Sequence, residues 1–129
     1  MNILTLEQLL ELHTIVIEAT GGSLGLRDLG RLEAAIATQT QNVFGEELYP
    51  SLYEKSAAII RAIIADHPYV DGNKRTALLA GLVLLDINDI AFKTEKKELE
   101  DFAVQIATKR LDVPQISVWL KKRSQNKKS

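Results

Sequence analysis

The stretch HPYVDGNKRTALLAGLVLL, residues 67–85, joins a dense polar segment directly to a strongly apolar one. Pro68 restricts the residue before it, so one helix is expected to end near His67 and another to begin near Asn73. The second helix, over residues 73–89, is apolar nearly all round, which is typical of a helix at the centre of a bundle. Its apolar run is too short to span a membrane. The stretch therefore predicts a buried helix that starts in a cluster of charge.

The flanking sequence also has mostly helical spacing. It predicts helices from residue 6 to about 20, over 30–41, 54–66 and 95–110, and a last one from residue 112. Polar residues that suit helix N-caps precede four of them: Thr5, Asp28, Thr94 and Asp112. Residues 42–53 lack a helical period and predict a loop or short hairpin, and residues 90–94 predict a short extended link. The expected fold is an all-α compact helical bundle.

Length and composition limit the kind of protein that this chain can be. The 129 residues, 46% hydrophobic and 26% charged, fit one globular domain over residues 1–120. The last nine residues hold five cations and no acid, and we interpret residues 121–129 as a flexible basic tail. Because the net charge is only −1, neither direct nucleic-acid binding nor membrane binding is expected.

The absence of cysteine excludes disulfides, thiolate catalysis and cysteine-ligated zinc. No secretory signal pattern is evident, so a cytoplasmic protein is expected.

Residues 72–75 suit an anion site. The first amides of a helix have no internal partner, the helix dipole adds positive charge there, and Lys74 and Arg75 add two full charges. GNKRT superficially resembles the end of a P-loop, but the earlier glycine of that motif and a parallel sheet are missing. A phosphate-binding helix start outside the P-loop class is the remaining interpretation.

Two further residues could complete a reactive site. A lone carboxylate such as Asp71 beside phosphates is a usual way to hold Mg²⁺, although a helix cap or ion pair would also explain it. An imidazole is a usual general base in enzymes, and His67 is a candidate, although a histidine at a helix end is often only a cap. The combination of a base, a carboxylate that could hold a metal and an anion site within nine residues favours a catalytic site. His13, in the middle of the first helix, is interpreted as a packing residue or a hydrogen-bond partner of a loop.

HPYVDGNKRTAL resembles the signature of the Fic/Doc superfamily, and in particular its Doc (death-on-curing) toxin branch. Two further blocks, residues 12–37 and 44–63, also resemble the Doc branch, so the likeness extends from about residue 5 to 120. It implies a Fic fold that binds ATP with Mg²⁺. By the resemblance, His67 is the catalytic base, Asp71 the metal-binding acid, and residues 42–52 a flap that pairs with the target chain. The phosphate-binding loop would comprise Gly72, Asn73, Lys74 and Arg75.

Two positions bear on the reaction that the resemblance implies. Adenylylating Fic proteins carry G-N-G-R-x-x-R, whereas Lys74 replaces the middle glycine here and Leu78 stands where the second arginine is expected. The Doc branch shares this change and transfers the γ-phosphate of ATP, with elongation factor Tu as target. The resemblance therefore implies a protein kinase that arrests translation. Transfer of AMP to a protein hydroxyl and a non-catalytic Fic-fold binding module are the alternatives, and a plain helical domain without a site is a third.

Some Fic proteins carry an inhibitory helix with the pattern S/T-x-x-x-E-[GN], and this sequence contains no copy. We therefore expect inhibition in trans by a separate antitoxin protein, through a segment that folds on binding. An apolar groove with a polar rim should then be open on the isolated domain.

Overall fold

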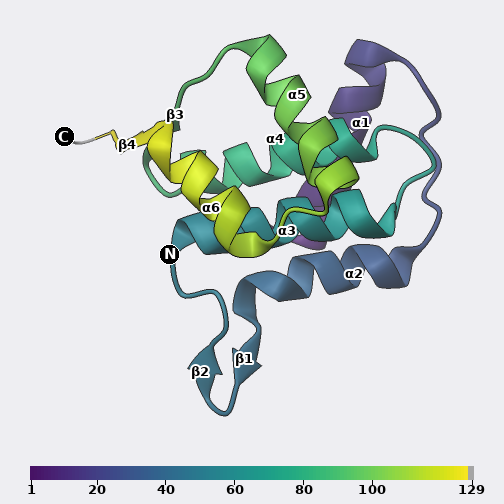
Figure 1. Cartoon of the computed structure of the whole chain (residues 1–129). Coiled ribbons are helices and arrows are strands. Elements are labelled where there is room, and N and C mark those ends of the chain that lie inside the picture. Colours follow the sequence, from purple (N-terminus) through teal and green to yellow (C-terminus); the bar gives the residue numbers. More distant parts are fainter. Residues whose placement is uncertain (128–129) are drawn as a thin grey trace.

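A computed structural model describes residues 1–127 and confirms the all-α bundle (Figure 1). Helices α3 and α4 form a central antiparallel pair, and the other helices pack around it. The helices are α1 (Leu6–Thr20), α2 (Leu29–Ala37), α3 (Leu52–Asp66), α4 (Asn73–Asp86), α5 (Lys96–Lys109) and α6 (Val113–Lys122), with a 3₁₀ turn at Thr38–Thr40. Two short antiparallel pairs join β1 (Asn42–Val43) to β2 (Glu46–Glu47) and β3 (Ile90–Phe92) to β4 (Ser124–Asn126). No helix in the described part of the chain is long and apolar enough to cross a membrane.

The two central helices approach closely at Gly81. A Cβ atom placed there would lie 2.3 Å from Cδ1 of Ile60 on α3, a distance that no real contact allows. The Ser56 hydroxyl of α3 donates to the Gly81 carbonyl at 3.1 Å and is itself fully buried. The absence of a side chain at Gly81 therefore allows α3 and α4 to pack this closely.

Most predicted helix starts are confirmed at the level of hydrogen bonds. Thr5 and Asp112 form capping boxes, and the Asp28 side chain accepts from the amide of Arg31. Two predictions are wrong. Helix α3 begins at Leu52 rather than residue 54, because Ser51 forms a capping box with Glu54.

The second error concerns α5. Its N-cap is Glu95, without a side-chain cap bond, and the Thr94 hydroxyl donates instead to the Glu98 carboxylate at 2.9 Å. Helix α4 ends at Asp86, three residues before the expected end, and β3 begins at Ile90 as the extended link predicts.

The hairpin of β1 and β2 confirms the irregular segment near residue 42, and a buried lysine fixes it. Lys55 on α3 is only 2% exposed, and its ammonium donates to the Gln39 carbonyl at 2.6 Å and to Glu47 of β2 at 2.9 Å. A buried charge is tolerated only when it is paired and hydrogen-bonded. The hairpin is thus tied to the N-terminal half of α3.

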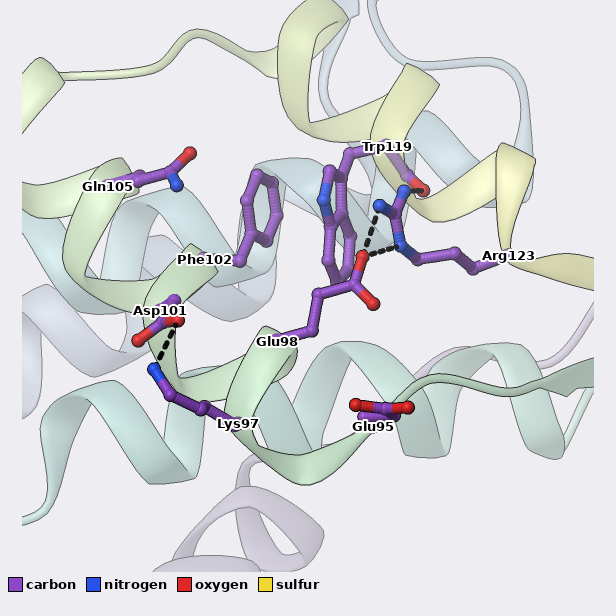
Figure 2. A pocket seen from close by; sticks show the side chains of 8 residues that line it. All are labelled: Glu95, Lys97, Glu98, Asp101, Phe102, Gln105, Trp119 and Arg123. Atoms are coloured by element: carbon purple, nitrogen blue, oxygen red, sulfur yellow. Dashed lines mark hydrogen bonds and ion pairs between the residues drawn. The ribbon is translucent and has the colours of Figure 1, made fainter.

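The tail does not behave as expected over residues 121–127. Lys121 and Lys122 close α6, and β4 then pairs with β3. Figure 2 shows how the end of α6 is held: Trp119 lies between Phe102 and Arg123, and Arg123 also bonds to Glu98. This hydrogen bond from Arg123, and next the one from Thr94, lowers the pKa of Glu98. The rest of the predicted flexible tail, residues 128–129, lies outside the described residues.

We predict that Gly81→Ala destabilises the protein by about 1–3 kcal/mol, because the added methyl group overpacks the contact with Ile60. Gly30→Ala, at an exposed position of α2, is the matched control, and its effect should stay within about 0.5 kcal/mol. Urea unfolding followed by circular dichroism measures both. Equal stability of the two variants would contradict the close approach of α3 and α4.

Candidate functional site

His67 is placed at the exposed C-terminal end of α3 in an unusual backbone conformation. Its φ of 49° and ψ of 60° lie in the left-handed region, which costs a non-glycine residue about 1–3 kcal/mol. Ring atom Nδ1 lies 3.3 Å from the Ala65 carbonyl oxygen. Because a carbonyl only accepts, this contact requires the proton on Nδ1 and leaves Nε2 of the neutral ring with its lone pair. The ring is therefore oriented to act as a base through Nε2.

Arg27 in the loop before α2 fixes this end of α3. Its Nε donates to the His67 carbonyl and its Nη2 to the Asp66 carbonyl, both at 2.7 Å. Arg31 of α2 also donates to the Asp66 carbonyl, at 2.8 Å, so that this carbonyl accepts from two arginines. Cations at a helix C-terminus satisfy its free carbonyls and the negative end of its dipole. These contacts offset the backbone strain at His67.

The loop between α3 and α4 is closed by Asn73. Its Oδ1 accepts from the Tyr69 amide at 3.0 Å, and its Nδ2 donates to the Tyr69 carbonyl at 2.9 Å. Asn73 is 8% exposed and Tyr69 1% exposed, so the bonds lie in the interior. The Asn73 side chain therefore shapes the loop, and its contribution to an anion site comes through its backbone amide.

Helix α1 clamps the loop from the other side. His13 stacks on Tyr69 with ring centroids 3.7 Å apart, and its Nε2 donates to the Asp71 carbonyl at 2.8 Å. The Tyr69 hydroxyl donates to the Leu9 carbonyl at 2.9 Å, while burial raises the pKa of this phenol above its usual range. The predicted bond from His13 to a loop is confirmed.

Gly72 is the N-cap of α4 and needs to be glycine for two reasons. Its φ is 76°, and a Cβ atom there would lie 3.0 Å from Cδ1 of Ile17 on α1. The preceding Asp71 is exposed, and its Oδ2 accepts from the Ser23 amide at 2.8 Å. This bond fixes the carboxylate while leaving Oδ1 for a ligand.

The predicted site residues come together in one open cavity of about 290 Å³, lined by His67, Val70, Asp71, Gly72, Asn73, Lys74 and Arg75. Lys74 and Arg75 are exposed, and within residues 1–127 neither forms an ion pair. The first backbone amides of α4 have no partner within the helix, and the residues that carry them line this cavity. The cavity can therefore hold a polyanion beside a general base.

The donor set fits Mg²⁺ bound with a nucleotide. Among the described residues there is no group of three or more carboxylate or imidazole side chains that could form a complete metal site. A single carboxylate is sufficient for Mg²⁺ when water and phosphate oxygens complete its coordination. Asp71, two residues before the first residue of α4, meets that requirement.

The hairpin expected to act as a flap lies elsewhere. It leads into the N-terminus of α3, whereas His67 follows the C-terminus, so the two lie at opposite ends of this helix (Figure 1). A helix of 15 residues is about 22 Å long. The segment that lies beside the site is residues 23–28. Leu26 faces Tyr69 in an antiparallel bridge, with the Val70 amide donating to Gly25 at 2.9 Å and the Arg27 amide to Pro68 at 2.8 Å.

Sequence reasoning missed this segment and Arg27. Their contacts join residues about 40 positions apart, mostly through backbone atoms, and such contacts leave no local pattern. The only available signal was an arginine directly before the helix cap Asp28. Leu78 is 6% exposed and lines a smaller groove of about 190 Å³ with Lys74, Arg75 and residues of α5.

The fold and this loop define a Fic-type domain. The model of the Fic/DOC family matches residues 3–85, which include the whole site. The chain is 38% identical over 104 residues to Toxin Doc of Mycolicibacterium smegmatis, covering 79% of this chain and 80% of the relative. It is 35% identical over 116 residues to Protein kinase doc of Escherichia phage P1, covering 90% of each chain. The protein belongs to the Fic/Doc family.

We predict that Asn73→Ala destabilises the protein by about 2–4 kcal/mol, because it leaves the buried amide and carbonyl of Tyr69 without partners. Asn73→Asp should also destabilise the protein, because it keeps the acceptor for the Tyr69 amide but turns a carboxylate oxygen toward the Tyr69 carbonyl. Lys74→Ala removes an exposed side chain and should change stability by no more than about 0.5 kcal/mol. Urea unfolding compares the three variants, and a loss for Asn73→Ala no larger than that for Lys74→Ala would contradict the structural role.

Proposed function

We propose that the protein is a Doc-type toxin that phosphorylates a hydroxyl group of a translation factor, with elongation factor Tu as the expected target. The observation that carries the proposal is the cavity at the start of α4 that brings together His67, Asp71 and two cations, Lys74 and Arg75, that form no ion pair within residues 1–127. The similarity to relatives named Toxin Doc and Protein kinase doc supports the assignment as a toxin and as a kinase.

Each group of the site has a separate role in the proposed reaction. The amides at the start of α4, with Lys74 and Arg75, hold the phosphates of ATP and stabilise the charge of the transition state. Asp71 would hold Mg²⁺, which when bound neutralises phosphate charge. His67 Nε2 takes the proton of the acceptor hydroxyl while the new O–P bond forms to the γ-phosphorus. The bond from that phosphorus to the β–γ bridging oxygen breaks, and ADP leaves.

Lys74 and Leu78 favour phosphate transfer over AMP transfer. A guanidinium at position 78 would hold terminal phosphates away from the acceptor, whereas Leu78 is apolar and buried against α5. Lys74 adds a charge next to the loop that suits the γ-phosphate. Transfer of AMP is the second candidate reaction, because the same base, carboxylate and helix start would serve it with the nucleotide reversed.

We further propose that a separate antitoxin protein inhibits the enzyme. The groove between α4 and α5 has an apolar floor of Leu78, Ala103 and Val104, with Lys74, Arg75 and Glu100 beside it. A segment that folds into this groove would cover the two cations that hold the phosphates. The open groove agrees with the expectation from the missing inhibitory motif.

The reaction type is tested by incubating the protein with Mg²⁺, purified elongation factor Tu and ATP labelled at either the γ- or the α-phosphate. We predict that only the γ-label is transferred, and that His67→Ala lowers transfer by at least about 100-fold. A bacterial lysate in place of the factor tests whether another protein is the acceptor. Transfer of the α-label alone would instead support the AMP transferase, and growth arrest that persists in His67→Ala would support a binding module.

A second prediction concerns Arg27, a positioning residue. Arg27→Ala should lower kcat about 10- to 100-fold with little change in KM for ATP, because the His67 carbonyl loses its donor and the base loses its orientation. Arg31→Ala is the matched control: it removes one bond to the Asp66 carbonyl and the exposed ion pair with Asp28 but no bond to His67, and it should lower kcat much less. A parallel loss of kcat in both variants would show a general effect on α3 rather than on His67.

A further inference from the structure

A second groove adjoins His67. It has a volume of about 320 Å³ and lies between the C-terminal half of α3, the C-terminal half of α5 and the loop before α6. Ile64 and Ile106 are almost fully buried, and Leu111 is half-buried beside them. His67 lines both this groove and the cavity at the start of α4. The base is thus shared by two binding spaces of different chemistry.

Two arginines lie on the rim of this groove. The Nε of Arg61 donates to the Leu111 carbonyl at 3.2 Å, which fixes the exposed guanidinium beside the groove. Arg110, at the C-cap of α5, is exposed, and within residues 1–127 neither arginine forms an ion pair. None of the residues that line the groove carries a carboxylate. An apolar floor with an unpaired positive rim complements an apolar side chain next to an acidic one.

We propose that this groove binds the acceptor protein, taking up an apolar residue close to the reactive hydroxyl while Arg61 and Arg110 select an adjacent carboxylate. The proposal rests on the transfer to a protein hydroxyl argued above and adds the acceptor's sequence preference. Attacking and leaving oxygens lie on opposite sides of the phosphorus in phosphoryl transfer, so the acceptor hydroxyl must reach the phosphorus from the side away from the leaving group. The helix start takes the phosphates, which leaves the groove side of His67 to the acceptor.

Binding can be tested without catalysis. The ¹⁵N-labelled chain without nucleotide is titrated with two blocked peptides, Glu-Leu-Thr-Leu-Glu and Lys-Leu-Thr-Leu-Lys, and amide shifts are followed by NMR. We expect the acidic peptide to shift amides around residues 64–67 and 106–111 and to bind at least about fivefold tighter than the basic one. Arg110→Glu should reverse this preference. Lys93→Glu, the same charge change after β3 at the far end of α4, should leave it unchanged.

Three results would overturn the proposal. They are equal affinity for the two peptides, shifts confined to other parts of the chain, or an unchanged preference in Arg110→Glu. A separate titration with ATP alone can also overturn it. If ATP shifts the amides of residues 106–111, the groove binds the nucleotide rather than the acceptor.

Kinetics then separates this proposal from the proposed function. With elongation factor Tu as acceptor, Arg110→Glu should raise KM for the factor at least about tenfold and leave KM for ATP unchanged. If neither label of ATP reaches any protein, the proposed kinase fails. The peptide titration still decides whether the groove selects acidic, apolar segments.

Discussion

The site depends on the closure of one six-residue loop by Asn73. Both polar atoms of its side chain are used on the backbone of Tyr69, so Tyr69 is drawn into the interior against His13. This sets where α4 begins and therefore where its free amides point. Asp71 is placed by the same closure, since its carbonyl accepts from His13 while its carboxylate turns outward to Ser23. One amide side chain thus positions the first backbone amides of α4 and the Asp71 carboxylate together.

The base is held by a different set of contacts. His67 lies in the left-handed region directly before Pro68, where continuation of the helix is disfavoured. The cost of this conformation is offset by bonds from Arg27 to the carbonyls of Asp66 and His67. Residues 23–28 therefore contact both halves of the site. The Ser23 amide donates to the Asp71 carboxylate, and the Arg27 side chain donates to the His67 carbonyl. One segment of six residues therefore supports both the Asp71 carboxylate and the backbone of His67.

Local signals explain how much of this could be predicted. Caps such as Thr5 and Asp112, and the change from polar to apolar at Asn73, depend on neighbours in sequence and predicted the helices well. The clustering of the residues from His67 to Arg75 also followed from their short spacing. The position of the hairpin, the role of Arg27 and the pairing of β4 with β3 depend on contacts across the fold. The tail was misjudged because charge suggested solvation, whereas Arg123 stacks on Trp119.

The distribution of paired and unpaired cations links the fold to its chemistry. Lys55 and Arg123 each contact an acid and each hold a structural element in place. Around His67, by contrast, the cations on both sides lack an acidic partner within the described residues, and helices α3, α4 and α5 fix their positions. A net charge of −1 therefore conceals a local positive field. Such a field attracts anionic groups to both of the cavities that His67 lines, so the fold concentrates negative charge on two sides of one imidazole.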